Sequence, residues 1–135
     1  MIKSAVLFIS LLFSFTPMAF ATQNPLIRNC HLAGGHFTEV KTHNDQIGLC
    51  EFGHSYLGSL DVLNYLNQIL VPASVANYKD NITECEGEVV VTQVLNTKVN
   101  ITICQFSDGS IMDLKTLTLG LSDPNHAQLN QFLGL

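Results

Sequence analysis

Four of the five histidines lie close together in the sequence, as His31, His36, His43 and His54. Imidazole nitrogens on a hairpin can converge on a metal ion, and histidine can also respond to acid near pH 5 to 6. None of the four forms a His-x-x-x-His pair on a predicted helix, so this spacing favours scattered surface histidines. If a metal binds, we expect His36, His43 and His54 to be its ligands.

The other reactive residue types form no catalytic pattern. Ser55 follows His54 directly, but neighbouring residues seldom form a nucleophile and base pair, and the chain has no Gly-x-Ser-x-Gly motif. Glutamate occupies every second position as Glu84, Glu86 and Glu88, so on a strand these side chains would share one face. Such a row is typical of a solvated strand edge, although three carboxylates can also hold Ca²⁺. We therefore predict a protein that is not an enzyme and has no cofactor, with a small hydrolase as an alternative.

The four cysteines predict two disulfides. An even number of cysteines in a short exported chain is typical of a disulfide framework, and four cysteines allow three pairings. The similar steps of 20 and 19 residues favour the pairs Cys30–Cys50 and Cys85–Cys104. A zinc site is the alternative, but no Cys-x-x-Cys pair is present.

Export is predicted from the first 21 residues. Lys3 precedes an apolar run over 5–15, and Ala19-Phe20-Ala21 fits a signal-peptidase site, so we expect residues 1–21 to be removed. An uncleaved N-terminal anchor is the alternative. No later segment approaches 18 apolar residues, so no stable membrane insertion is expected after cleavage. The mature protein is expected in the periplasm or outside the cell.

Composition excludes two classes of partner. The chain has six Lys and Arg against eleven Asp and Glu, a net charge of −5, and loss of Lys3 leaves −6. Nucleic acid needs clustered cations, and so does electrostatic binding to anionic lipid, so neither is expected. With 47% apolar residues, the chain can bury a core.

Alternating apolar residues predict two hairpins. The first runs from Gly35 to Thr42 and from Ile47 to Phe52, around a turn at His43–Gln46. The second has strands over 88–95 and 98–106.

Helices are predicted beside these hairpins. Leucines at helical spacing predict a helix from Ser59 to Val71, where Pro72 ends it, and a short helix over 73–79. The alternation of Leu and Thr within 111–121 favours a strand, and Asp123-Pro124 predicts the start of a terminal helix.

The expected fold class is α+β, with two disulfide-closed β-hairpins and helices packed on one side. We expect a hairpin and helix over 22–71, a linker over 72–84 and a second hairpin unit with a C-terminal helix over 85–135. Each unit has two cysteines and then Phe two residues after the second, which suggests an internal repeat. The units are expected to pack as one compact domain.

The first unit resembles DUF333, a bacterial family of small exported domains that carry the label hemolysin in many genomes. The matching residues are Asn24-Pro25, Cys30, Gly34-Gly35, Gly48, Cys50 and Phe52. The resemblance covers residues 24–52, and residues 85–114 look like a divergent second copy. Family members carry a tryptophan downstream, and this chain has none.

Taken together, the sequence predicts a small, disulfide-stabilised binding protein with a protein partner. Its oligomeric state is open. One alternative is an inhibitor that docks on an extracellular enzyme through the turn at His43–Gln46. Another is a metal- or acid-responsive envelope protein that uses the histidines between His31 and His54.

Overall fold

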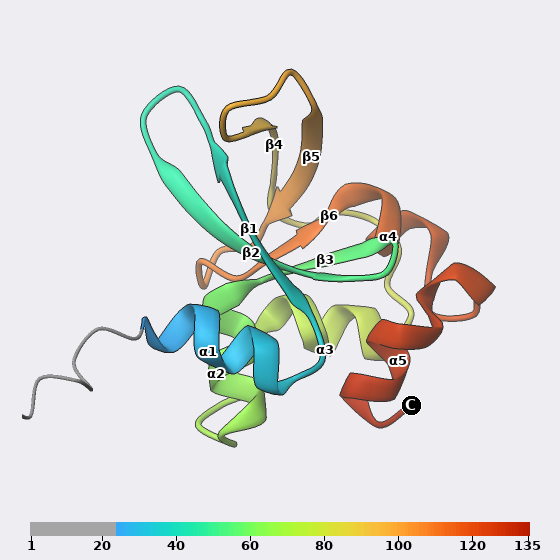
Figure 1. Ribbon diagram of the computed structural model, residues 1–135. Coiled ribbons are helices and arrows are strands. Elements are labelled where there is room, and N and C mark those ends of the chain that lie inside the picture. The colour runs from blue at the N-terminus through green and yellow to red at the C-terminus, as the bar shows by residue number, and fades with distance from the viewer. Residues whose placement is uncertain (1–23) are drawn as a thin grey trace, which may run out of the picture.

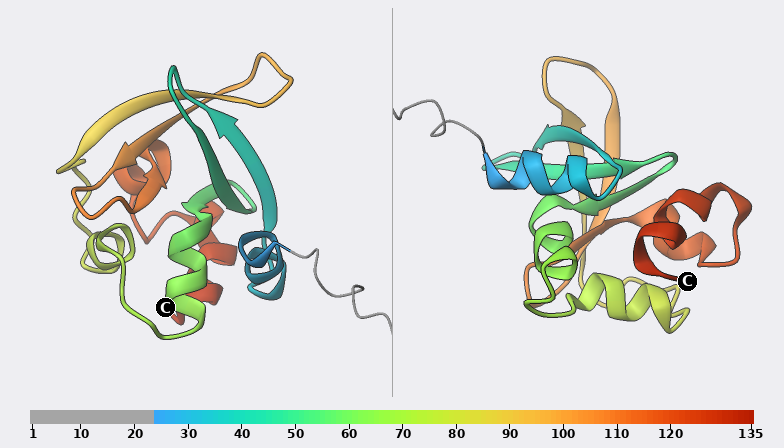
Figure 2. Two further views of the ribbon diagram at one scale, coloured as in Figure 1. Left: turned by 90° about the vertical axis from the view of Figure 1, so that its left-hand side faces the viewer. Right: turned by 60° about the horizontal axis from the view of Figure 1, so that its bottom comes forward.

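The structure, a computed structural model, describes residues 24–135. The predicted signal peptide, residues 1–21, lies outside the described residues. Helices and strands are both present, which confirms the predicted α+β class. Two long hairpins project away from most of the helices, which gather at the opposite end of the sheet (Figures 1 and 2).

Residues 24–79 form the first half of the fold. Its first helix begins where the Asn24 side chain accepts a hydrogen bond from the Leu26 N–H at 2.8 Å, and Pro25 takes the first helical position. This helix was not predicted from the sequence. The elements of this half are α1 (Pro25–Leu32), β1 (His36–Lys41), β2 (Gln46–Phe52), β3 (Ser55–Gly58), α2 (Ser59–Leu66) and α3 (Ala73–Lys79).

Residues 80–135 form the second half. Except for α1, its elements follow the same order as those of the first half, with three strands before the helices. The carboxylate of Asp123 accepts a hydrogen bond from the Asn125 N–H at 2.8 Å and starts the terminal helical segment, as predicted. The elements are β4 (Glu88–Val94), β5 (Asn100–Gln105), β6 (Ile111–Asp113), α4 (Leu114–Leu119), the 3₁₀ helix η3 (Pro124–His126) and α5 (Ala127–Leu133).

The six strands close into one barrel in the order β1-β2-β3-β6-β5-β4. Two seams join the halves. The β1–β4 seam has two residue pairs, and the β3–β6 seam has a single pair, Leu57 opposite Met112. The predicted arrangement of two disulfide-closed hairpins is therefore not confirmed. Both hairpins exist, but β3 and β6 connect them into a single sheet.

Apolar residues cover both faces of the sheet. Adjacent residues such as Leu49 and Cys50 are both fully buried, because one points into the barrel and the other toward the helices. Val75 and Tyr78 place α3 in the helix-side core, so the segment predicted as a linker contributes to packing. The barrel-side cluster consists of Val40, Leu49, Ile101, Ile103 and Ile111. The helix-side core includes Phe52, Leu57, Val62, Met112, Leu117, Leu129 and Leu133.

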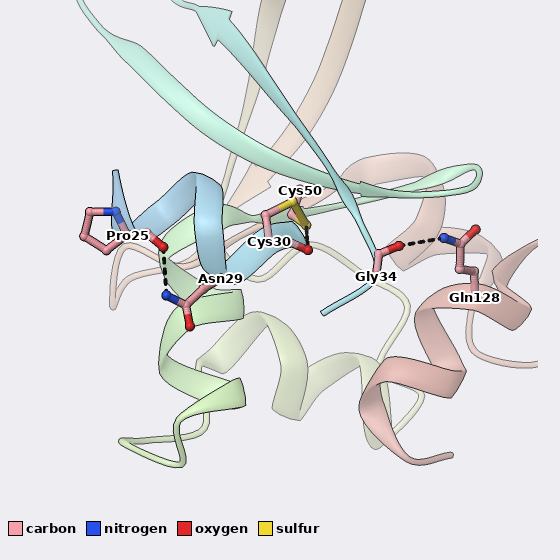
Figure 3. Close-up of a disulfide and its surroundings, with 6 residues drawn as sticks. All are labelled: Pro25, Asn29, Cys30, Gly34, Cys50 and Gln128. Carbon is pink, nitrogen blue, oxygen red and sulfur yellow. Dashed lines mark hydrogen bonds between the residues drawn. A yellow bond between two sulfur atoms is a disulfide. The ribbon is translucent and has the colours of Figure 1, made fainter. Parts of the chain in front are cut away.

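Both predicted disulfide pairings are present, Cys30–Cys50 and Cys85–Cys104. The first bridges α1 to β2 (Figure 3). Gly35 lies against it so closely that a Cβ atom there would collide with the Cys50 sulfur, which explains why glycine stands at this position.

A polar contact between the halves lies close to this disulfide. The side chain of Gln128, on α5, donates to the Gly34 carbonyl at 3.1 Å. The loop that follows α1 is therefore held by the C-terminal helix as well as by the disulfide.

Two predicted boundaries are wrong. The helix that begins at Ser59 ends at Leu66, because the Asn67 side chain donates to the Leu63 carbonyl at 2.9 Å and Gln68 takes a left-handed φ of 56°. The strand favoured over 111–121 ends at Asp113, whose carboxylate starts α4. In both places a polar side chain forms a hydrogen bond with a backbone group at the end of a helix. The pattern of apolar residues does not predict where such an end lies.

Removing either disulfide should destabilise the protein, and removing Cys30–Cys50 should cost more. Each bridge closes a loop of about 20 residues, worth about 3 kcal/mol in the chain-entropy model. Cys30 and Cys50 are also fully buried, whereas Cys85 is partly exposed, so the first bridge contributes additional packing. Urea unfolding of the two double alanine variants measures the difference. A larger loss for the Cys85 and Cys104 variant would contradict this reasoning.

Candidate functional site

The structure separates the histidines that the sequence suggested as metal ligands. His36 begins β1, whereas His43 lies in the turn beyond the other end of that strand, roughly 20 Å away at about 3.3 Å per residue. His54 lies in the turn between β2 and β3. Within residues 24–135, no three His, Cys, Asp or Glu residues are grouped closely enough to hold a metal ion. The predicted site with His36, His43 and His54 is therefore not assembled.

A different region forms a cavity that is lined by both polar and apolar residues. It has a volume of about 650 Å³, within the range of protein binding sites. Its walls come from the first residues of β5, the turn between β2 and β3, and the junction of β6 with α4. The lining residues that matter for its chemistry are Glu51, Tyr56, Asn100, Thr102, Asp113 and Lys115.

One wall of this cavity is the edge of β5 beyond the end of β6. β6 pairs with β5 only from Ile103 to Gln105, so within the described residues no strand pairs with Asn100, Ile101 or Thr102 on this side. The N–H of Val94 donates to the carbonyl of Val99, which fixes the ladder of the β4–β5 hairpin.

This ladder also fixes the direction of the backbone groups of β5. Hydrogen-bonded and non-hydrogen-bonded pairs alternate along an antiparallel ladder. Given the bond from Val94 to Val99, Ile101 bonds toward β4, while the N–H and C=O groups of Asn100 and Thr102 point toward the unpaired edge. Ile103 and Asp113 form a non-hydrogen-bonded pair, so the flanking Thr102 carbonyl faces the N–H of Leu114. The cavity wall thus presents two backbone donors, from Asn100 and Thr102, and one free backbone acceptor, from Asn100.

Glu51 and Tyr56 form the opposite wall of the cavity. They face each other across the β2–β3 pair, and the Tyr56 hydroxyl donates to Glu51 Oε2 at 3.2 Å. Burial, together with the negative charge of Glu51, raises the pKa of Tyr56 to about 12. Tyr56 therefore stays a neutral donor at physiological pH, and the carboxylate keeps a defined position.

Asp113 lies at the base of the cavity and bridges the two halves. Its carboxylate accepts hydrogen bonds from the N–H of Tyr56 at 2.7 Å and from the N–H of Thr116 at 3.0 Å. Burial raises the pKa of Asp113, and these hydrogen bonds oppose the shift. The side chain thus holds the β3–β6 seam and starts α4 at once.

Asp61 holds the same seam from the other side. Its carboxylate accepts hydrogen bonds from the N–H of Ile111 at 2.7 Å and from the Ser74 hydroxyl at 3.2 Å. Burial raises the pKa of Asp61 to about 7. This side chain therefore links α2, α3 and β6, and it titrates near neutral pH.

Sequence reasoning missed most of the cavity. Of the residues proposed as metal ligands, only His54 lines it, and Asn100 and Thr102 were interpreted as ordinary polar positions of a strand. No local signal in the sequence marked this edge, because the strand expected within 111–121 was long enough to pair with all of β5, whereas β6 ends at Asp113.

Comparison with family models, with curated proteins and with solved structures found no match to this chain. The resemblance to DUF333 therefore stays a prediction. Within residues 24–135, no helix combines the length and apolar character needed to cross a membrane.

Asp61 should make stability depend on pH. The pKa of Asp61 is about 7 in the folded protein and ordinarily 3.8, so between these values the folded protein binds more protons than the unfolded chain. The free energy of unfolding should then fall as pH rises from about 4 to about 7, by up to ~1.4 kcal/mol per pH unit. Asp61→Asn keeps an acceptor oxygen but does not titrate, so we expect it to reduce this slope in urea unfolding from pH 4 to 8.

The control for this experiment is Asp45→Asn, which removes the same charge from an exposed turn. That variant should keep the slope of the unaltered protein. An equal slope in the Asp61→Asn variant would show that this carboxylate is not the titrating group.

Proposed function

We propose that this chain is a small exported binding protein that takes up an extended segment of a protein partner along the free edge of β5. The observation that carries the proposal is the unpaired run from Asn100 to Thr102, which forms a wall of the 650 Å³ cavity. Addition of a strand to an exposed sheet edge is a recurrent mode of peptide recognition.

The geometry of the edge supports this mode. Backbone groups of alternate residues, Asn100 and Thr102, point toward the cavity, which is the spacing at which an added strand forms its hydrogen bonds. The neighbouring walls, from Glu51 to Tyr56 and from Asp113 to Lys115, offer contacts for side chains. Main-chain bonds would supply affinity and these walls would supply specificity.

The two disulfides support a location outside the cytoplasm, because such bonds persist in oxidising compartments. We propose export through residues 1–21 to the periplasm or beyond. We also propose that the halves arose by duplication of a DUF333-like unit. The shared element order and the position of Cys50 and Cys104 on the second strand of each half support this origin.

Two matched proline variants test the binding edge. Val91 and Thr102 lie opposite each other on the β4–β5 hairpin, and the N–H of each points away from the partner strand. Proline at either position therefore removes an outward donor and leaves the hairpin ladder intact. We expect Thr102→Pro to weaken binding of peptides selected from a random heptapeptide library at least tenfold, and Val91→Pro to leave binding unchanged.

Amide hydrogen exchange gives the second readout of this experiment. A selected peptide should protect the amide of Thr102 in the unaltered protein. Selected peptides whose binding survives Thr102→Pro, or that leave this amide unprotected, would refute binding at this edge.

An enzyme inhibitor that presents the β1–β2 turn is the second candidate. The Thr42 hydroxyl accepts hydrogen bonds from the N–H groups of Asn44 at 3.2 Å and Asp45 at 3.0 Å, so the turn is held in one shape before any contact. The turn also lies at the tip of a projecting hairpin (Figure 1).

A loosened turn tests this second candidate. An inhibitor of this kind should slow at least one member of a panel of serine, cysteine and metalloproteases. Thr42→Ala should weaken that inhibition, because a flexible turn loses entropy on docking. Inhibition that is absent, or unaffected by the substitution, would remove this candidate.

A further inference from the structure

We propose that the segment bound along β5 presents a lysine or arginine side chain to Glu51. This inference rests on the proposed function and adds the chemistry of the bound segment. It follows from the face of the sheet on which Glu51 lies, from the charges around the cavity and from the direction in which an added strand would point its side chains.

Glu51 lies on the inner face of the barrel. It is directly opposite Tyr56 in the β2–β3 pair, and paired residues share a face of the sheet. Tyr56 packs against the barrel-side cluster, to which Ile101 belongs. Glu51, Tyr56 and Ile101 therefore lie on the same face, and all three line the cavity.

A strand added to β5 would send every second side chain to this inner face. Its residues hydrogen-bonded to Asn100 and Thr102 would share the outward face of those residues. The residue between them would lie opposite Ile101 and point inward, to the side of the sheet where Glu51 stands. One central position of the bound segment is therefore the one that meets the carboxylate.

The charges around the cavity favour a cation at that position. The residues that line the cavity include two carboxylates, Glu51 and Asp113. The carboxylate of Asp113 is already occupied by two backbone N–H groups, whereas the hydrogen-bond donor to Glu51 is one neutral hydroxyl.

The remaining side chains of the cavity leave Glu51 available. Lys115 also lines the cavity, but it is an exposed residue of α4, so its charge can remain in solvent. The mature chain carries a net charge of −6 after loss of Lys3, which attracts a basic segment over a longer range.

Three peptides that differ only at the central residue test the inference. The probes are Ac-Thr-Val-Ser-X-Ser-Val-Thr-NH₂, in which X is lysine, norleucine or glutamate, measured against the disulfide-bonded protein by fluorescence anisotropy at low and high salt. We expect the lysine peptide to bind at least tenfold more tightly than the norleucine peptide, and the glutamate peptide to bind most weakly. The advantage of lysine should shrink at high salt, because a partly exposed ion pair is screened.

Glu51→Gln and a matched control identify the carboxylate responsible. In Glu51→Gln, we expect the preference for lysine over norleucine to fall below threefold, with little change in binding of the norleucine peptide. Glu39→Gln removes the same charge from the neighbouring strand β1, from a partly buried residue that does not line the cavity. That variant should keep the full preference.

The outcomes separate this inference from the function on which it rests. Equal binding of all three peptides, abolished by Thr102→Pro, would overturn the role of Glu51 and leave binding at the edge intact. A preference for lysine that survives Glu51→Gln would also overturn the inference. If no peptide binds and the amide of Thr102 stays unprotected at millimolar peptide, both the inference and the proposed function fail.

Discussion

The barrel depends on two buried carboxylates at the β3–β6 seam. This seam contains a single residue pair, Leu57 opposite Met112, and on each strand the residue before that pair donates its N–H to an aspartate side chain. Asp113 accepts a hydrogen bond from the N–H of Tyr56, and Asp61 accepts one from the N–H of Ile111. Each carboxylate therefore binds a strand of the other half. Loss of either would leave a buried N–H without a partner, which costs about 1 to 3 kcal/mol. The seam is thus closed by side chains where the backbone ladder is shortest.

The two halves supply these carboxylates from different positions, and the difference explains two local features. In the second half the aspartate directly follows the paired strand residue, as Asp113. In the first half Gly58 stands there, and the carboxylate comes from Asp61, three residues later. A Cβ at Gly58 would lie 2.7 Å from Asp61 Oδ2, so glycine makes room for that side chain. Thr116 is the counterpart of Asp61, and its N–H donates to the Asp113 carboxylate at 3.0 Å. Each half thus supplies one carboxylate to the seam, and the other of the two equivalent positions is occupied by Gly58 or Thr116.

The parts of this fold that could be predicted from the sequence are those fixed by local pattern. The alternation of apolar residues predicted both hairpins, and the similar cysteine steps indicated both disulfides, because such signals act over about 20 residues or fewer. Closure into a barrel could not be predicted, since it rests on pairs such as Leu57 with Met112, which are 55 residues apart. The end of β6 was missed for the same reason. Its final residue, Asp113, reads as an ordinary polar position until Tyr56 is known to lie beside it. The cavity was missed in turn, because its walls come from three separate stretches of chain.

The short seam and the free edge of β5 have one cause. Asp113 directs its carboxylate to Tyr56 and to the first turn of α4, so the chain leaves the sheet after only three residues of β6. β5 is six residues long and is held by β4 along its whole length, so it continues past the point where β6 ends. The unpaired backbone groups of Asn100 and the unpaired N–H of Thr102 are the direct result. Edge strands usually invite unwanted pairing and are blunted or covered. Here the edge lines a cavity together with residues of α4 and of the turn after β2. The residue that helps to close the barrel is therefore also the one that leaves this edge of β5 without a strand partner.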